Sequence, residues 1–318
     1  MTGPGSELVP TAPPAAGVAG AAPVPGQGDV PSPAGGGGRP RRGRVLRRLR
    51  RNPLSMVGLV ILVLAVLAAV FAPLVAPYSP TAVHFRATLQ PPGTIGFGLG
   101  TDDLGRDLFS RVLFGLRASL EVGALSVLVA LVFGVPFGLL AGYFRALDAV
   151  ISRFTDLMLA FPFLILAVGL AAIRGASLTN AAVAVGISQI PGMIRVVRSE
   201  TLRLKEQEFV AAAVVDGAGD VTVMTRHILP NALSAVIVQT TVAIPVAILG
   251  EAVLSFLGLG IQPPAPSLGT MLSAAQQYAA KAPWTAIVPG LAIVVLTLAF
   301  NLFGDGLRDA LDPRGSRR

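Results

Sequence analysis

Carboxylates and histidines are the side chains in this sequence whose spacing could support chemistry. The densest group is Asp102, Asp103 and Asp107, three carboxylates within a short polar stretch. Oxygen ligands this close could hold calcium, but their spacing does not match the calcium-loop pattern. We therefore predict no metal site, and expect these carboxylates to cap the following helix or to pair with Arg106 and Arg111.

Nucleophilic and metal chemistry find little support elsewhere in the chain. There is no cysteine, which excludes thiolate nucleophiles, thiolate metal sites and disulfides. The two histidines, His84 and His227, fall on opposite sides of the membrane in the topology predicted below. No serine nucleophile motif lies near His227. The sequence therefore argues against an intramembrane enzyme, and we predict that the chain is not an enzyme.

The lysines decide whether this chain could bind ATP through a phosphate loop of its own. Such a loop ends in Gly-Lys followed by Ser or Thr. The only lysines are Lys205 and Lys281, and neither follows a glycine. We expect no cofactor in this chain, and any ATP-driven function would need a separate ATPase.

Several carboxylates lie in or beside apolar segments, where a charge costs about 2.5–3.5 kcal/mol on insertion scales and so faces protein or water. Glu251 is the deepest, near the outer third of the predicted fifth helix. It is expected to line a solute path or to contact a companion subunit. Asp156 and Glu200 lie near the inner edge, where we expect pairing with Arg153 or Arg203.

The elements that position these residues are apolar segments long enough to cross a membrane. Hydrophobic residues make up 53% of the 318-residue chain and charged residues only 13%, too few charges to cover a soluble surface. A spanning helix needs about 20 apolar residues. A further uncharged run, 252–280, contains Gly258–Gly269, whose glycines and prolines break any helix, so 258–283 is expected to be a connection. About six spans result: 54–77, 122–144, 157–173, 175–194, 228–250 extended to 257, and 282–304.

Prolines recur inside these spans, at Pro136, Pro162, Pro191 and Pro245. Neighbouring helices can satisfy the backbone groups that a proline frees, and transporters use such breaks as bending points. We predict hinges at Pro191 and Pro245, and place both on the translocation path.

Charge distribution orients the chain. The chain has a net charge of +8, and eight of its arginines lie within 39–51, directly before the first apolar run. A basic flank of this kind orients a membrane helix and attracts anionic lipid, so we predict no nucleic-acid partner. Lysines and arginines divide 19 to 6 in favour of the side that holds the N-terminus. Both termini are therefore predicted to be cytoplasmic in a multi-pass protein of the cell membrane.

The predicted organisation follows from these segments. Residues 1–38 are Pro-, Gly- and Ala-rich and are expected to be a disordered tail. The first span is longer than a signal-peptide core, so we expect a retained anchor. The predicted order is a basic flank at 39–53, the first membrane helix at 54–77, an extracytoplasmic segment at 78–116, a five-helix core at 117–310 that includes a cytoplasmic loop at 200–228, and a tail at 311–318.

The loop at 200–228 carries the strongest pattern in the sequence. A helix-forming stretch at 206–215 is broken by Gly217 and Gly219, and a second stretch at 221–228 is expected to run until Pro230. The pattern predicts a helix–turn–helix at the inner membrane face. Small side chains on one side would allow a partner's groove to approach the backbone closely.

This loop resembles the cytoplasmic loop of permease subunits in ABC importers. Ala211–Ala213 match the family's Glu-Ala-Ala triplet, except that alanine replaces the glutamate. Gly217 matches its glycine and Leu229–Pro230 its ending, with His227 at a usually hydrophobic position. Flanking motifs are similar to the C-type subunit of dipeptide and oligopeptide permeases: Gly100–Leu120, Arg226–Asn231, Glu251–Pro264 and Asn301–Arg314.

The resemblance implies an all-α membrane protein with a type I importer core. It implies partners as well: a second permease subunit, two ATP-binding subunits that hold ATP and Mg, a solute-binding protein, and membrane lipid. It implies two groups of site residues. The ATPase-coupling residues would be Ala211, Ala212, Ala213, Asp216, Gly217, His227, Leu229 and Pro230, and the structural motif at the outer mouth would be Gly100, Asp102, Asp103, Gly105, Arg106 and Asp107.

Two alternatives stay open at this point. An ion-driven secondary transporter would need intramembrane acids arranged as ion sites, often across inverted repeats, and no convincing repeat is evident. An ABC permease for nickel or another non-peptide solute shares the same architecture. The sequence therefore predicts an importer permease without fixing its solute.

Overall fold

The computed structural model describes residue 47, residues 49–50 and residues 52–311 of the chain. This part consists of helices and loops, and its only β-type pairing is two isolated bridges, Thr94 with Phe97 and Thr101 with Asp107. The all-α prediction is confirmed. The predicted tail at 1–38, most of the basic flank at 39–53 and residues 312–318 lie outside the described residues.

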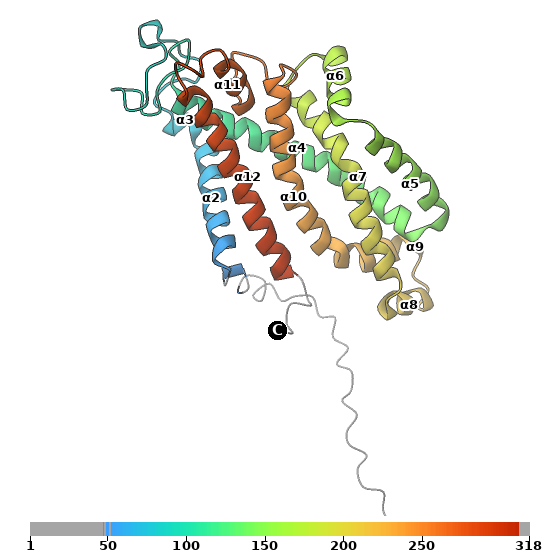
Figure 1. Cartoon of the computed structure of the whole chain (residues 1–318). Helices are drawn as coiled ribbons and strands as arrows, with labels where there is room; N and C mark the ends of the chain where they lie inside the picture. The colour runs from blue at the N-terminus through green and yellow to red at the C-terminus, as the bar shows by residue number, and fades with distance from the viewer. Residues whose placement is uncertain (1–46, 48, 51, 312–318) are drawn as a thin grey trace, which may run out of the picture. The chain divides into compact units, whose positions relative to one another are not determined.

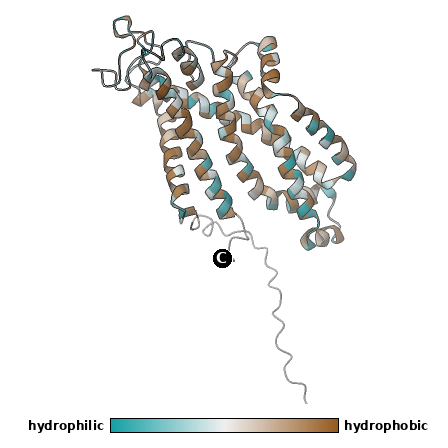
Figure 2. Ribbon diagram, in the orientation of Figure 1, coloured by the Kyte–Doolittle hydropathy of each residue, from teal (hydrophilic) through white to brown (hydrophobic). Residues whose placement is uncertain are grey.

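Five helical segments of the described chain are long and apolar enough to cross a membrane. A sixth span results if the bent pair α5 (Arg145–Ala160) and α6 (Phe163–Arg174) is counted as one. Figure 2 shows hydrophobic residues along much of the length of these helices. The prediction of about six spans therefore holds. The five segments are α2 (Pro53–Val70), α4 (Leu108–Tyr143), α7 (Leu178–Lys205), the continuous helix Asp220–Phe256 and α12 (Trp284–Leu311).

The first two spans differ from their predicted limits. Helix α2 ends at Val70, and a separate turn, α3 (Ala72–Val75), follows it with Pro73 in its first turn. Proline lacks the N–H that would continue the preceding helix, so the predicted helix at 54–77 is split. Helix α4 begins at Leu108, well inside the predicted 78–116 segment. Asp107 caps it, and 36 residues continue through Pro136.

The predicted third span at 157–173 is not one straight helix. Phe161 is extended (φ −90°, ψ 122°), and the axes of α5 and α6 differ by 82°. The cause is Pro162, because a residue that precedes proline is pushed out of the helical region. Of the prolines inside predicted spans, Pro162 breaks its helix, whereas Pro191 and Pro245 lie within continuous ones.

The sequence pattern predicts that a helix ends at Pro230, but in the structure Pro230 lies inside a continuous helix. A short turn, α9 (Asp220–Thr222), leads into a π-helical turn, η2 (Val223–Ile228), and α10 (Leu229–Phe256) continues directly from it. A π turn shifts the hydrogen bonds from i−4 to i−5. This relieves the clash that Pro230 would otherwise make with the preceding turn.

Helix α4 packs most extensively against α7. Three glycines at four-residue spacing, Gly134, Gly138 and Gly142, allow this approach. A Cβ added at Gly138 would lie 2.6 Å from Cβ of Val197. Seams of small residues at this spacing let membrane helices approach closely. The other two glycines lie in the same way against Met193 and Thr201 of α7.

The remaining elements close the two ends of the bundle. The connection predicted at 258–283 is present and contains one short helix, α11 (Leu268–Ala275), with a capping box between Ser267 and Thr270. Figure 1 shows the short helix α8 (Glu208–Val215) at one end of the bundle. The start of α2 and the end of α12 lie toward that same end, while α3, α6 and α11 lie at the other.

Candidate coupling site and supporting polar sites

Helix α8 is a separate helix because its C-terminus carries a complete glycine stop. Gly217 has a left-handed conformation (φ +83°) and donates its N–H to the carbonyl of Val214 at 3.0 Å. Ala218 donates to the carbonyl of Ala213, also at 3.0 Å. These are the two bonds of the Schellman motif, in which glycine is favoured because it has no Cβ. Gly217 therefore ends α8 and turns the chain back.

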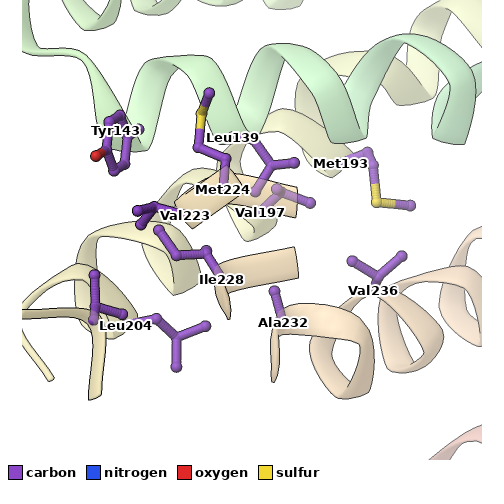
Figure 3. Close-up of a cluster of buried hydrophobic side chains, with 11 residues drawn as sticks. Leu139, Tyr143, Met193, Val197, Leu204, Val223, Met224, Ile228, Ala232 and Val236 are labelled. Atoms are coloured by element: carbon purple, nitrogen blue, oxygen red, sulfur yellow. The ribbon is translucent and has the colours of Figure 1, made fainter. Parts of the chain in front are cut away.

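One side of α8 is anchored in the largest apolar cluster of the described chain. Val210 and Ala213, three residues apart, are buried, and Val210 belongs to a cluster with Leu204, Val223 and Ile228. Figure 3 shows side chains from α4 and from η2 converging in this cluster. Packing of this kind fixes α8 against η2 and the end of α7.

The opposite side of α8 is apolar and exposed. The side chain of Val215 is 86% exposed and that of Val214 is 52% exposed, and Phe209 is also exposed. Ala211 and Ala212 lie on this outer side as well. α8 has only eight residues and belongs to none of the spanning segments. A firmly held helix thus presents apolar groups beyond the bundle.

The predicted coupling residues divide into two groups in the structure. Ala211 and Ala212 are exposed on α8, whereas Ala213 is buried. Asp216 is the C-cap of α8 and Gly217 its stop. The second group is half-buried where η2 passes into α10, and consists of His227, Leu229 and Pro230.

A polar group that the sequence did not suggest lies beside α8. The Tyr143 hydroxyl, at the end of α4, donates to Oδ1 of Asp220 at 2.8 Å. Lys205, at the end of α7, donates from Nζ to the Tyr143 carbonyl at 2.6 Å. These residues are far apart in the sequence, so spacing gives no signal. Their positions at helix ends are the one feature that could have indicated them.

Glu251 is fully buried between α10 and α4. Its carboxylate accepts hydrogen bonds from Ser119 at 3.0 Å and from Ser255 at 2.7 Å. Ser255 in turn accepts the N–H of Ile261 at 3.1 Å. In this conformation the carboxylate is occupied by protein groups and has no exposed surface. Pro191 and Pro245, the other predicted path residues, are also buried.

Ion pairs connect α5 with α7. Arg198 forms two hydrogen bonds with the carboxylate of Asp148. Asp156 pairs with Arg195 at 2.8 Å, and not with Arg153 as expected, because the bend after α5 lays that helix alongside α7. The expected pair between Glu200 and Arg203 is present.

The carboxylates of the 100–107 turn act as caps and ion-pair partners, as predicted. Asp102 accepts the N–H groups of Leu104 and Arg106, and also the Arg106 guanidinium at 2.6 Å. Asp107 accepts the N–H and the hydroxyl of Ser110, at 2.8 and 2.6 Å. Asp103 adds a longer ion pair to Arg106 at 3.6 Å. Asp107 therefore caps the first turn of α4, whereas Asp102 and Asp103 stabilise the turn that precedes it.

The two glycines of this turn have different neighbours. Both have positive φ, +82° at Gly100 and +72° at Gly105, a conformation that glycine adopts without strain. A Cβ at Gly105 would collide with the backbone of His84, and one at Gly100 with the backbone of Gln90. The two positions therefore hold the turn against the 84–90 segment.

Comparison with known proteins places the chain in a family. Residues 134–317 match the family model for a binding-protein-dependent transport system inner membrane component. Residues 41–92 match the N-terminal TM domain of oligopeptide transport permease C.

Curated relatives match most of the chain. A dipeptide transport system permease protein of Alkalihalophilus pseudofirmus is 46% identical over 271 residues, which cover 85% of this chain and 89% of the relative. A glutathione transport system permease protein of Pectobacterium atrosepticum is 49% identical over 217 residues, covering 68% and 72%.

A solved structure shares the fold. A chain of the MetNI methionine ABC transporter, in an inward-facing conformation, superposes with a TM-score of 0.53 at 21% identity. The match covers 64% of this chain and 96% of that chain. These findings confirm the resemblance to ABC importer permeases that the loop and flanking motifs indicated. The chain therefore belongs to the binding-protein-dependent transport system inner membrane component family.

Proposed function

We propose that this chain forms half of the translocation path of an ATP-driven peptide importer, and that α8 receives a separate ATPase subunit. The observation that carries the proposal is the two-sided character of α8. Val210 and Ala213 are buried in the bundle, while Val214 and Val215 extend outward. A short helix with an exposed apolar side suits the groove of a partner protein. Because the inner side is tightly packed, a displacement of α8 would move the ends of the spanning helices.

The proposed orientation puts α8 in the cytoplasm. Lysines and arginines are concentrated on the side of the N-terminus, 19 against 6. α8 lies toward the same end as the start of α2 and the end of α12 (Figure 1). Both termini and the ATPase contact would then be cytoplasmic, in a protein of the cell membrane.

The proposed assembly contains three kinds of protein partner besides lipid and solute. A second permease subunit would complete the path, two ATP-binding subunits would hold ATP and Mg, and a binding protein would deliver solute at the opposite face. This chain would supply no bond chemistry. The proposed hinges remain Pro191 and Pro245. For Glu251, full burial favours a role in fixing α4 against α10 over contact with solute.

Peptides are the proposed solute class. The support is the similarity to relatives named for dipeptide and glutathione transport, at 46% and 49% identity. Uptake of labelled di- and tripeptides, competed by unlabelled peptides and by nickel, measures this directly. If nickel competes and unlabelled peptides do not, the transported solute is not a peptide.

Copurification and uptake test the mechanism. A tagged chain should bring down an ATPase and a second permease in mild detergent. Uptake should stop when the ATPase loses the lysine of its phosphate loop, and should survive an ionophore but not ATP depletion. Uptake by the isolated chain, or uptake abolished by ionophore alone, would instead indicate an ion-driven transporter.

A further inference from the structure

We propose that Tyr143 is a positioning residue that links the α8 segment to helix α4 by holding both ends of that segment. The proposal rests on the proposed function and deepens it. Lys205 lies just before α8 and Asp220 just after its Gly217–Gly219 turn. Both are bonded to Tyr143. One residue of α4 is therefore bonded to both ends of the loop that carries α8.

The Lys205 contact uses the exposed end of α4. Tyr143 is the last residue of that helix, so its carbonyl has no partner within the helix. Lys205 donates to this oxygen at 2.6 Å, and its Nζ lies 4.8 Å from the centroid of the Tyr143 ring. A cation at a helix C-terminus is favoured by the helix dipole, and the ring face adds a cation–π contact. The end of α7 is thus joined to the end of α4.

The Asp220 contact joins the other side of the loop. Asp220 is the first residue of the helix that continues through η2 into α10, where a carboxylate is favoured by the helix dipole. It accepts the Tyr143 hydroxyl at 2.8 Å. A hydrogen bond to a charged acceptor is stronger than a neutral one. The Tyr143 hydroxyl therefore connects the start of one spanning helix with the end of another.

The position of Tyr143 makes it suited to transmit movement. Its ring lies among the buried side chains that hold α8 (Figure 3), and only 9% of the residue is exposed. From Tyr143, α4 runs as one continuous helix to Leu108, beside the capped 100–107 turn at the other end of the bundle. A pull on α8 would reach that end through α4. The apolar packing holds α8 in place, and the two bonds to Tyr143 add specific connections between its loop and α4.

The test replaces the hydroxyl and measures coupling. Tyr143→Phe keeps the ring, the backbone carbonyl and the apolar packing. In the complete reconstituted complex we expect normal assembly and normal ATP hydrolysis, with about fivefold less solute moved per ATP hydrolysed. Fivefold corresponds to about 1 kcal/mol, the typical net value of one hydrogen bond.

Matched variants separate transmission from packing. Asp220→Asn keeps an acceptor oxygen and should couple nearly as the wild type does, whereas Asp220→Ala should behave as Tyr143→Phe does. The double variant Tyr143→Phe/Asp220→Ala should be no worse than either single one, because both remove the same bond. Tyr78→Phe is the control, since its hydroxyl makes no hydrogen bond in the described structure and it lies beside His84 and Phe97, away from α8.

Each result bears on the proposal. Solute moved per ATP unchanged in Tyr143→Phe, or additive losses in the double variant, would overturn it. Loss of assembly in both Tyr143→Phe and Asp220→Ala would also overturn it, because the bond would then be needed only for folding. Failure of the wild-type chain to assemble with an ATPase would instead count against the proposed function.

Discussion

The carboxylate of Glu251 on α10 accepts the hydroxyl of Ser119 on α4 at 3.0 Å, with neither residue exposed. Ser255 donates to the same carboxylate at 2.7 Å. The group is placed where two spanning helices meet the 257–267 connection. A charge at this depth would be unfavourable in lipid, and the hydroxyl donors compensate for its burial.

Glu251→Ala should therefore destabilise the chain. It removes two hydrogen bonds and leaves two buried hydroxyls without their acceptor, each at a cost of about 1–3 kcal/mol. The unfolding temperature in detergent should fall clearly for Glu251→Ala. It should fall less for Ser119→Ala. Glu121→Ala, at an exposed glutamate of α4 two residues after Ser119, is the control. A changed solute preference in a Glu251→Gln variant of unchanged stability would indicate contact with solute instead.

The glycine seam between α4 and α7 gives a second prediction. Gly138→Ala would place a methyl group 2.6 Å from Cβ of Val197 and 3.0 Å from the carbonyl of Ile194. These atoms cannot rotate away, so the helices must separate, at about 1–3 kcal/mol. Gly169→Ala in α6 makes the same change where no atom lies within 4 Å. Equal unfolding temperatures for the two variants would show that the seam is not tightly packed.

The 100–107 turn gives a third prediction. Asp102→Ala removes the acceptor for the Arg106 guanidinium and for two backbone N–H groups. We expect faster proteolysis of the 78–107 segment, because the loss leaves a nearly buried cation without its closest partner. Treatment of the wild type with a calcium chelator should change nothing. If the chelator reproduces the effect of Asp102→Ala, the turn holds an ion.

The exposed side of α8 gives a fourth prediction. Val215→Asp would put a charge where the proposed ATPase groove excludes water, and we expect about tenfold or greater loss of ATPase affinity. Val221→Asp, at another exposed valine beyond Gly217, should have a smaller effect. Copurification yield and a binding titration measure both. Equal losses at the two positions would contradict a groove specific to α8.

The spans were predictable because each is a run of consecutive apolar residues long enough to cross a membrane. The stop at Gly217 and the cap at Asp107 followed from local chemistry in the same way. The bend at Phe161–Pro162 was misjudged because an uncharged run does not reveal whether a proline breaks a helix, as Pro162 does, or lies within one, as Pro191 does. Pro230 was misjudged because a π turn before it leaves no periodic signal.

Contacts across the bundle were the least predictable. Asp156 was expected to pair with Arg153 of its own helix, but it reaches Arg195 because the bend after α5 brings that helix along α7. The bonds from Tyr143 to Asp220 and from Lys205 to Tyr143 join helix ends from distant parts of the chain. Such contacts depend on how helices pack, and the spacing of residues in one segment does not contain that information.

The most direct test measures whether α8 is accessible to a thiol reagent from each side of the membrane. Because the chain has no cysteine, a single introduced cysteine is the only residue that the reagent labels. In a Val215→Cys variant, the thiol should react with a membrane-impermeant maleimide only after sealed, right-side-out vesicles are opened. It should be protected when the ATPase is bound. Labelling in intact vesicles, or labelling that the bound ATPase does not reduce, would contradict the account.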